Sequence, residues 1–179
     1  MKEGLIMKRL LLVVDVQNDF VSGVLGTPEA RAIVEGVTNK IKAYKDNDHE
    51  VVFTKDSHFE SDYLETQEGR NLPILHCIVG TYGHDLIPEI EAFSKDSKVI
   101  NKSQFGSIEV VDAIKQLAPD EIEMIGLCTD ICVVSNALII KAMLPETKIT
   151  VDASLCAGTS IERHLASLET MKSCQIHVL

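Results

Sequence analysis

Apolar and polar positions along this chain alternate in blocks that predict strands followed by helices. The run from Arg9 to Asp15 is almost entirely aliphatic, which is typical of a strand buried on both faces of a parallel sheet. Further on, Thr27-Pro28-Glu29 supplies an N-cap, a first-turn proline and an early acid, and apolar residues then recur at helical spacing. The pattern therefore predicts a first strand at 9–15 and a first helix at 28–45.

The same alternation continues to the end of the chain. Further strands are expected at Val51–Phe53, Lys98–Ile100, Glu121–Leu127, Lys148–Val151 and Gln175–Leu179, and further helices at Ile108–Leu117, Cys132–Leu144 and Ile161–Lys172. Right-handed crossovers place the helices of such a chain on both faces of a parallel sheet. We therefore predict an α/β fold of three layers, doubly wound, with a mostly parallel six-stranded sheet. A single domain is expected over residues 1–179, with residues 1–6 as a candidate leader.

Composition narrows the classes of partner. The formal net charge of −10 disfavours a nucleic-acid partner, because phosphate backbones repel an acidic surface. The apolar runs are too short or too interrupted to span a bilayer, so no membrane partner is expected. The five cysteines include no CxxC pair and are interpreted as reduced thiols of a cytoplasmic protein.

Four chemically capable side chains follow four successive predicted strands. Asp15, Asp56, Lys102 and Cys132 stand at or just after the carboxyl ends of these strands, where open parallel sheets bind their ligands. An acid, an amine and a thiol in one pocket supply a proton acceptor, a fixed charge and a nucleophile for acyl transfer. Cys132 also stands where a helix is expected to begin, and the positive end of a helix dipole favours thiolate over thiol.

Each of these residues also has an ordinary interpretation. Taken singly, Asp15 reads as a turn carboxylate, Lys102 as a solvated lysine and Cys132 as a small buried residue. Their matching positions at one edge of the predicted sheet favour a shared catalytic site over these separate explanations.

A second group of residues lies in the long segment 56–88, which shows little periodicity and is therefore expected to be functional or mobile. Asp56 and His58 alternate along an extended stretch, and His76 follows in the same segment. Such a set can close three sides of a site for one divalent metal ion, with zinc favoured and manganese or iron as alternatives. Glu65 is near enough in sequence to join directly or through water. Solvated side chains remain the alternative, and the chain contains no phosphate-binding glycine loop.

The motifs around these residues resemble the isochorismatase-like cysteine hydrolases, and among them most closely the nicotinamidases. The resemblance is carried by the blocks VDVQNDF (14–20), TKDSH (54–58), HCIVGTYG (76–83), NKSQF (101–105) and GLCTDICV (126–133). These blocks span nearly the whole chain in the order that the family shows.

The resemblance implies roles for individual residues. Asp15, Lys102 and Cys132 would form the catalytic triad, and Asp56, His58 and His76 would bind the metal, with Glu65 a candidate fourth ligand. It also implies a non-proline cis peptide at Leu127-Cys128, with the backbone N–H groups of Cys128 and Cys132 forming an oxyanion hole. Phe20 would be an aromatic wall for a flat substrate. Many nicotinamidases have a tryptophan where this chain has Ser57, so the other wall is either missing or supplied by another residue, such as Tyr63, Tyr82 or Phe105.

These observations predict a cysteine-dependent amidohydrolase that acts on a small-molecule amide, with nicotinamide as the expected substrate. A related hydrolase of N-carbamoyl or other small amides is the nearest alternative. A non-catalytic α/β module that stores or senses metal is the alternative from another class. Hydrolysis of a vinyl ether is disfavoured, since that reaction does not require a nucleophilic cysteine. The helix at 132–144 is apolar over more than one stripe, so we expect a homo-oligomer, dimeric or larger.

Overall fold

The computed structural model describes residues 7–179, so the leader expected at residues 1–6 lies outside the described residues. Six strands form one sheet in the order β3-β2-β1-β4-β5-β6, and every neighbouring pair is parallel. The strands are β1 (Arg9–Val14), β2 (Glu50–Asp56), β3 (Lys98–Lys102), β4 (Glu121–Leu127), β5 (Lys148–Ala157) and β6 (His177–Val178). The predicted doubly wound, six-stranded α/β fold is confirmed.

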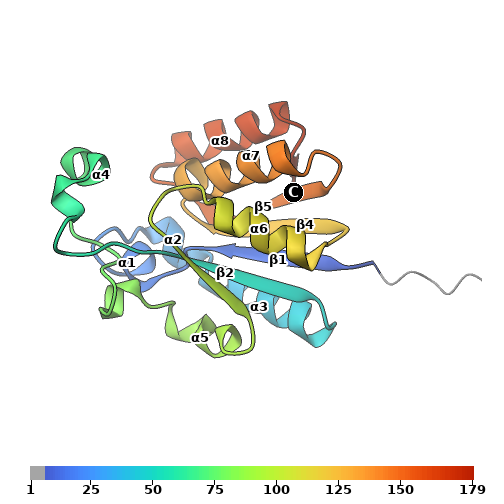
Figure 1. The fold of residues 1–179 in the computed structure, drawn as a ribbon, viewed down its shortest axis with the longest axis horizontal. Coiled ribbons are helices and arrows are strands. Elements are labelled where there is room, and N and C mark those ends of the chain that lie inside the picture. Colours follow the sequence, from blue (N-terminus) through green and yellow to red (C-terminus); the bar gives the residue numbers. More distant parts are fainter. Residues whose placement is uncertain (1–6) are drawn as a thin grey trace, which may run out of the picture.

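Helices cover both faces of the sheet (Figure 1). They are α1 (Asn18–Val21), α2 (Pro28–Ala32), α3 (Val34–Asp46), α4 (Gln67–Asn71), α5 (Pro88–Ser94), α6 (Ile108–Leu117), α7 (Val134–Met143) and α8 (Ile161–Ser173). Successive residues of β1 point to opposite faces, so Leu10 and Leu12 pack with α6, α7 and α8. Leu11 and Val13 pack with α2, α3 and α5. The central strands are therefore buried on both sides, as their continuous apolar runs predicted.

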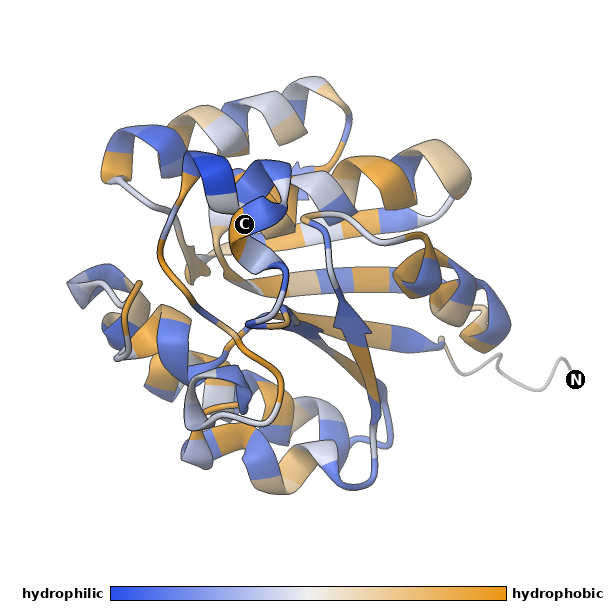
Figure 2. Cartoon of the chain, turned by 60° about the vertical axis from the view of Figure 1, so that its left-hand side comes forward, coloured by the Kyte–Doolittle hydropathy of each residue, from blue (hydrophilic) through white to orange (hydrophobic). Residues whose placement is uncertain are grey.

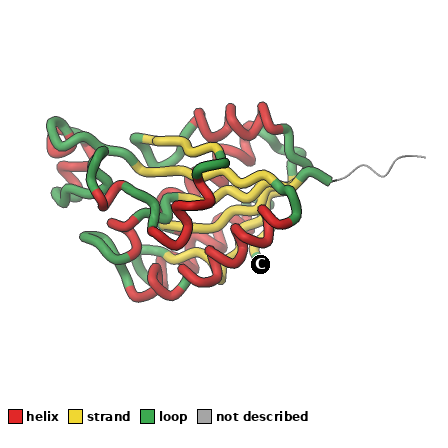
Figure 3. Tube along the Cα trace, turned by 90° about the horizontal axis from the view of Figure 1, so that it is seen from below, coloured by secondary structure: helices red, strands yellow, loops and turns green. Residues whose placement is uncertain are grey.

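Figure 2 shows the corresponding hydropathy pattern, with apolar stripes on the sheet and on the inner helix faces and polar residues outside. In Figure 3 the sheet lies between two layers of helices, and long loops gather at one end of the strands. Within residues 7–179, no helix combines the length and the apolar character needed to cross a membrane.

The short helices α1, α4 and α5 were not predicted, and several strand ends lie a few residues from their predicted positions. Three further differences concern the course of the chain. The helix predicted at 28–45 is interrupted at Ile33, which separates α2 from α3. β5 continues to Ala157, because pairing with β4 resumes beyond a register shift between Met124 and Gly126. The helix expected from Cys132 starts as a wide π-type turn at Thr129–Val133, and α7 begins only at Val134.

Gly126 allows β4 to pass close to β1 just before the turn that contains Cys132. Its φ of +121° is rarely adopted by other residues, and a Cβ atom there would lie 2.1 Å from the carbonyl oxygen of Val14. The close approach of these two strands brings the end of β1, and with it Asp15, next to the turn.

Replacing Gly126 by alanine is expected to lower the free energy of unfolding by about 3 kcal/mol or more, because the new methyl group meets backbone that cannot move aside. Gly80→Ala is the matched control. Its φ of +86° is also positive, but nothing lies within 4 Å of the added carbon, so only about 1–2 kcal/mol of backbone strain is expected. Urea unfolding of both variants checks this, and equal losses would contradict it.

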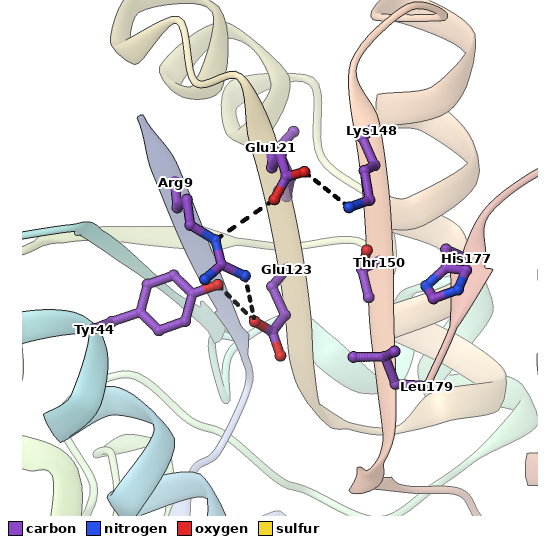
Figure 4. Close-up of a pocket in the computed structure, with 9 residues that line it drawn as sticks. Arg9, Tyr44, Glu121, Glu123, Lys148, Thr150, His177 and Leu179 are labelled. Carbon is purple, nitrogen blue, oxygen red and sulfur yellow. Dashed lines mark hydrogen bonds and ion pairs between the residues drawn. The ribbon is translucent and has the colours of Figure 1, made fainter. Parts of the chain in front are cut away.

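A network of paired charges lies at the other end of the sheet, where the strands begin. Buried Glu123 accepts hydrogen bonds from the Tyr44 hydroxyl at 2.6 Å and from Lys40 at 2.5 Å. Arg9, Glu121 and Lys148 continue the network around a cavity of about 110 Å³ (Figure 4). The charges here are paired with one another, so this network stabilises the sheet.

Candidate active site

The ends of three strands bring the three predicted catalytic side chains together. Lys102 is the last residue of β3, and its Nζ lies 2.6 Å from Asp15 Oδ2 and 3.4 Å from Cys132 Sγ. Asp15 follows β1, and Cys132 lies in the turn after β4. The three residues are at most 4% exposed. A thiol, an ammonium and a carboxylate thus share one buried site despite their separation in sequence.

Asp15 is oriented by a residue that the sequence analysis did not select. Its φ of +47° turns the chain sharply after β1, and its N–H donates to both oxygens of Thr54, the carbonyl at 3.3 Å and the hydroxyl at 3.2 Å. In return the Thr54 hydroxyl donates to Asp15 Oδ1 at 2.6 Å. Asp15 Oδ2 has the Lys102 ammonium as its ion-pair partner and accepts no other hydrogen bond within residues 7–179. This oxygen is the one available to take a proton. The only signal for Thr54 in the sequence is a polar residue that ends an apolar strand.

The surroundings of Cys132 raise the pKa of its thiol. Burial raises the pKa of Cys132 well above its ordinary value, and the Asp15 carboxylate adds to the rise, while Lys102 opposes it. The direction of this shift is opposite to that expected from a helix N-terminus. The sulfur lies inside the protein beside a carboxylate, and α7 begins two residues later. Ionisation of the thiol thus requires a proton acceptor within the site.

Asp15 and Lys102 also have shifted pKa values. Burial raises the pKa of Asp15, against the opposing effect of Lys102. Burial lowers the pKa of Lys102, but Asp15, Cys132 and Asp56 outweigh it and hold that pKa well above its usual value. Lys102 is therefore a fixed positive charge, and Asp15 is a stronger base than an exposed aspartate.

Next to the triad lies a compact group of metal-ligand types. Asp56, His58, Glu68 and His76 offer donor atoms that all lie within 4.8 Å of one another. Glu68, on the short helix α4, occupies the place proposed for Glu65. Glu65 is exposed in a 3₁₀ turn (Tyr63–Glu65), so the assignment of Glu65 is corrected to Glu68.

The donor spacing in this group fits a small divalent ion. His58 Nε2 lies 2.9 Å from Asp56 Oδ2 and 3.7 Å from Glu68 Oε1. His76 Nε2 lies 3.6 Å from each of the same two oxygens. Donors around a tetrahedral ion with bonds of about 2.1 Å are separated by about 3.4 Å. Two imidazoles and two carboxylates are donors that zinc, manganese and iron accept.

Hydrogen bonds and ring contacts orient the two histidines. His76 Nδ1 lies 2.8 Å from the carbonyl oxygen of Ile74, which leaves Nε2 directed at the group. The ring of buried Tyr63 packs at 4.8 Å from His58 and at 5.2 Å from His76, between centroids. Burial lowers the pKa of His76, but Asp56 and Glu68 outweigh this effect and raise it to about 10. The group therefore attracts positive charge.

Asp56 contacts both the catalytic triad and the other members of the metal-ligand group. Its Oδ1 lies 3.3 Å from Lys102 Nζ, whereas its Oδ2 faces the two histidines. Burial raises the pKa of Asp56, but these three partners outweigh burial and hold it below its ordinary value. Gln17, also missed from the sequence, fixes the backbone of Asp56. Its amide nitrogen donates to Asp56 O at 2.8 Å, and its amide oxygen accepts from Asp56 N at 2.7 Å.

The aromatic residues proposed as walls of the substrate site differ in burial and in distance from the metal-ligand group. Phe20 is buried, with its ring centroid 5.7 Å from that of His76. Tyr63 is buried against the histidines, whereas Tyr82 is 68% exposed and Phe105 is 43% exposed. The Ser57 hydroxyl lies 2.8 Å from His84 Nε2. Of the aromatic candidates, Phe20 and Tyr63 border the metal-ligand group directly.

The turn that contains Cys132 begins with a cis peptide bond between Leu127 and Cys128, at the position that the resemblance implied. The Cys128 carbonyl accepts the N–H groups of Ile131 and Val133, each at 3.1 Å. The next residue, Thr129, places its hydroxyl 2.8 Å from His164 Nδ1 on α8. The turn is thus held from inside and from the neighbouring helix.

The family model described as the isochorismatase domain matches residues 9–179 of this chain. The chain belongs to the isochorismatase family. This family member is 28% identical over 185 residues to the nicotinamidase/pyrazinamidase of Mycobacterium tuberculosis, an alignment that covers 96% of this chain and 98% of that protein.

Solved structures of other family members superpose closely on the chain. A nicotinamidase/pyrazinamidase from Bacillus subtilis superposes with a TM-score of 0.84 at 27% identity, covering 96% of this chain and 99% of that one. A pyrazinamidase of Pyrococcus horikoshii in complex with zinc gives 0.81 at 25% identity, with 96% and 98% covered. An N-carbamoylsarcosine amidase from Thermoplasma acidophilum gives 0.80 at 28% identity, with 96% and 95% covered. Together with the donor group, the zinc complex supports a site for a divalent metal ion in this chain.

Proposed function

We propose that this isochorismatase-family protein is a cysteine-dependent amidohydrolase that converts nicotinamide to nicotinate and ammonia. The observation that supports this most strongly is the buried contact of Lys102 with both the Asp15 carboxylate and the Cys132 sulfur. This set provides a nucleophile and a base, and the relatives named as nicotinamidases carry the substrate assignment.

In the first half-reaction, the Cys132 sulfur attacks the amide carbon while Asp15 Oδ2 takes the thiol proton. The carbonyl oxygen becomes an oxyanion, and the backbone N–H groups of Cys128 and Cys132 stabilise it. Losing one such donor typically costs about 3 kcal/mol of barrier. Asp15 then passes its proton to the nitrogen of the collapsing intermediate, so the C–N bond breaks, ammonia leaves and a thioester remains.

In the second half-reaction, Asp15 takes a proton from water as the water attacks the thioester carbon. The C–S bond breaks, nicotinate leaves and the proton returns to the Cys132 sulfur. Lys102 keeps its charge throughout and stabilises whichever of the two partners is anionic. One carboxylate therefore acts in turn as base, acid, base and acid.

Asp56, His58, Glu68 and His76 would hold the metal ion, for which zinc is the proposed identity. When bound, the ion would supply a Lewis acid that helps to orient the substrate. Phe20 would pack against the ring of the substrate.

Ammonia release by the purified protein tests the proposed function. Nicotinamide is compared with N-carbamoylsarcosine, each with and without a chelator. We expect nicotinamide to be the better substrate and its KM to rise after metal removal. The alternative, hydrolysis of an N-carbamoyl amide, is supported by the similarity to the Thermoplasma enzyme. Faster turnover of N-carbamoylsarcosine that is insensitive to chelation would favour this alternative and refute our assignment.

The role of Glu68 can be separated from that of Glu65 by metal affinity. Glu68→Gln removes a charged ligand, so affinity for zinc is expected to fall about 10- to 100-fold. Glu65→Gln makes the same chemical change three residues away, at an exposed position, and should bind zinc as the parent does. Competition against a chelating indicator measures both. A larger loss for Glu65→Gln would restore the original assignment.

A further inference from the structure

A buried asparagine fastens the loop after Lys102 to the helix after Cys132. Asn136, on α7, is fully buried. Its Nδ2 donates to the Phe105 carbonyl at 2.9 Å and to the Cys132 carbonyl at 2.8 Å, and its Oδ1 accepts from the Ser107 N–H at 3.1 Å. One side chain thus binds the backbone of the nucleophile and the backbone on both sides of Gly106.

The loop itself lies directly on α7. A Cβ atom on Gly106 would meet the terminal Cδ1 atom of Ile139, which would have to shift, and would lie 3.3 Å from Ser135 Cβ, so the glycine packs closely against the helix. Phe105, next to it, keeps a ring that is 43% exposed. The backbone of Phe105 is therefore linked through Asn136 to the backbone of Cys132, and the Phe105 side chain is only partly covered by the protein.

We propose that Asn136 is a positioning residue that fixes Phe105 relative to the Cys132 thiol and so sets a preference for flat aromatic acyl groups over small aliphatic ones. The inference deepens the proposed function and rests on Cys132 as the nucleophile of that site. Asn136 does not touch the reacting atoms. Its contribution comes through the aromatic wall, so its loss affects ligands that have a ring and spares those that have none.

Three variants separate this role from general support of the fold. Asn136→Thr keeps a hydroxyl that can bond the carbonyl four residues earlier, which is that of Cys132, but it is too short to reach the loop. Gly106→Ala adds a methyl group at the contact between the loop and α7, which is expected to loosen this contact, and it leaves Asn136 unchanged. Phe105→Ala removes the ring and keeps both backbone contacts. All three are expected to show the same change in ligand preference.

Two alkylating reagents with the same reactive group provide the test. Iodoacetamide and iodoacetanilide both form a C–S bond with the thiol as the C–I bond breaks and iodide leaves, and the thiol proton passes to Asp15 or solvent. Only the second carries an aromatic ring. The rate of labelling of the peptide containing Cys132 is followed by mass spectrometry, and the anilide-to-amide ratio is divided by the same ratio for glutathione. We expect the parent to favour the anilide, and each variant to lower the ratio about 5-fold with the iodoacetamide rate within about 2-fold of the parent.

The proposal is overturned if Asn136→Thr and Gly106→Ala keep the parental ratio, or if labelling by both reagents falls equally, as it would after a general loss of structure. If Asn136→Thr does not fold, as judged by its melting temperature, the ratio of Gly106→Ala decides. In variants that turn over, KM for nicotinamide should rise with kcat nearly unchanged. Because labelling needs no turnover, a parent protein that releases no ammonia from nicotinamide would refute the proposed function and leave this test intact.

Discussion

Cys132→Ala is expected to lower kcat for amide hydrolysis by at least about 10⁴-fold while the fold and the metal content stay unchanged. The reason is chemical, because no other side chain replaces the sulfur that forms the acyl bond. The lost sulfur is small and buried, and its neighbours Lys102 and Asp15 keep their ion pair. Ammonia release and metal analysis on the same preparation measure both parts.

Cys156→Ala is the matched control for this experiment. Cys156 is also buried, and burial raises the pKa of its thiol to about 12, but it lies on β5 away from Lys102. The control should lose some stability and retain turnover. A Cys132→Ala protein that turns over at the parental rate would exclude covalent catalysis.

The second large effect is expected for Asp15→Asn, which should lower kcat/KM by about 10³-fold or more. The amide has nearly the shape of the carboxylate, but it cannot take the thiol proton. Since burial already raises the pKa of Cys132, the thiol would then remain protonated. Asp85→Asn, at a side chain that is 56% exposed and paired with Lys55, makes the same change outside the site and should leave kcat/KM unaltered. Activity in Asp15→Asn near the parental value would show that another group accepts the proton.

The pH dependence follows from the same carboxylate. Asp15 acts as a base in its ionised form, so activity is lost as the pH falls through its pKa, which burial raises. The hydrogen bond from Thr54 lowers that pKa. Thr54→Val removes this bond, raises the pKa further and should move the acid limb of the kcat/KM profile to higher pH. A limb that moves to lower pH would argue against Asp15 as the base.

Much of the fold could be predicted from the sequence because the strands are buried on both faces. A run as apolar as Leu10–Val14 is expected to form a buried central strand in a protein of this size, and parallel strands need helical crossovers. The convergence of Asp15, Lys102 and Cys132 followed from the same topology, since residues after parallel strands meet at one edge of the sheet.

Other features depended on geometry that sequence spacing does not encode. The candidate fourth ligand depended on which residue of the segment 63–71 faces the histidines. Glu68 on α4 does so, whereas Glu65 is exposed in the 3₁₀ turn that precedes this helix. Thr54 and Gln17 act through hydrogen bonds to backbone and carboxylate atoms from distant segments. The rise in the pKa of Cys132 depended on the extent of its burial, whose effect exceeds the opposing effect of Lys102.

The two-sided position of Asp56 restricts how such a protein can diverge. One carboxylate contacts both the ammonium beside the thiol and the histidines of the ligand group, so a substitution that altered metal preference there would also disturb the nucleophile. The loop carrying Phe105 does not link the thiol to the metal-ligand group in this way. Selection for a new substrate on this scaffold should therefore accumulate changes in that loop and leave Asp56 untouched.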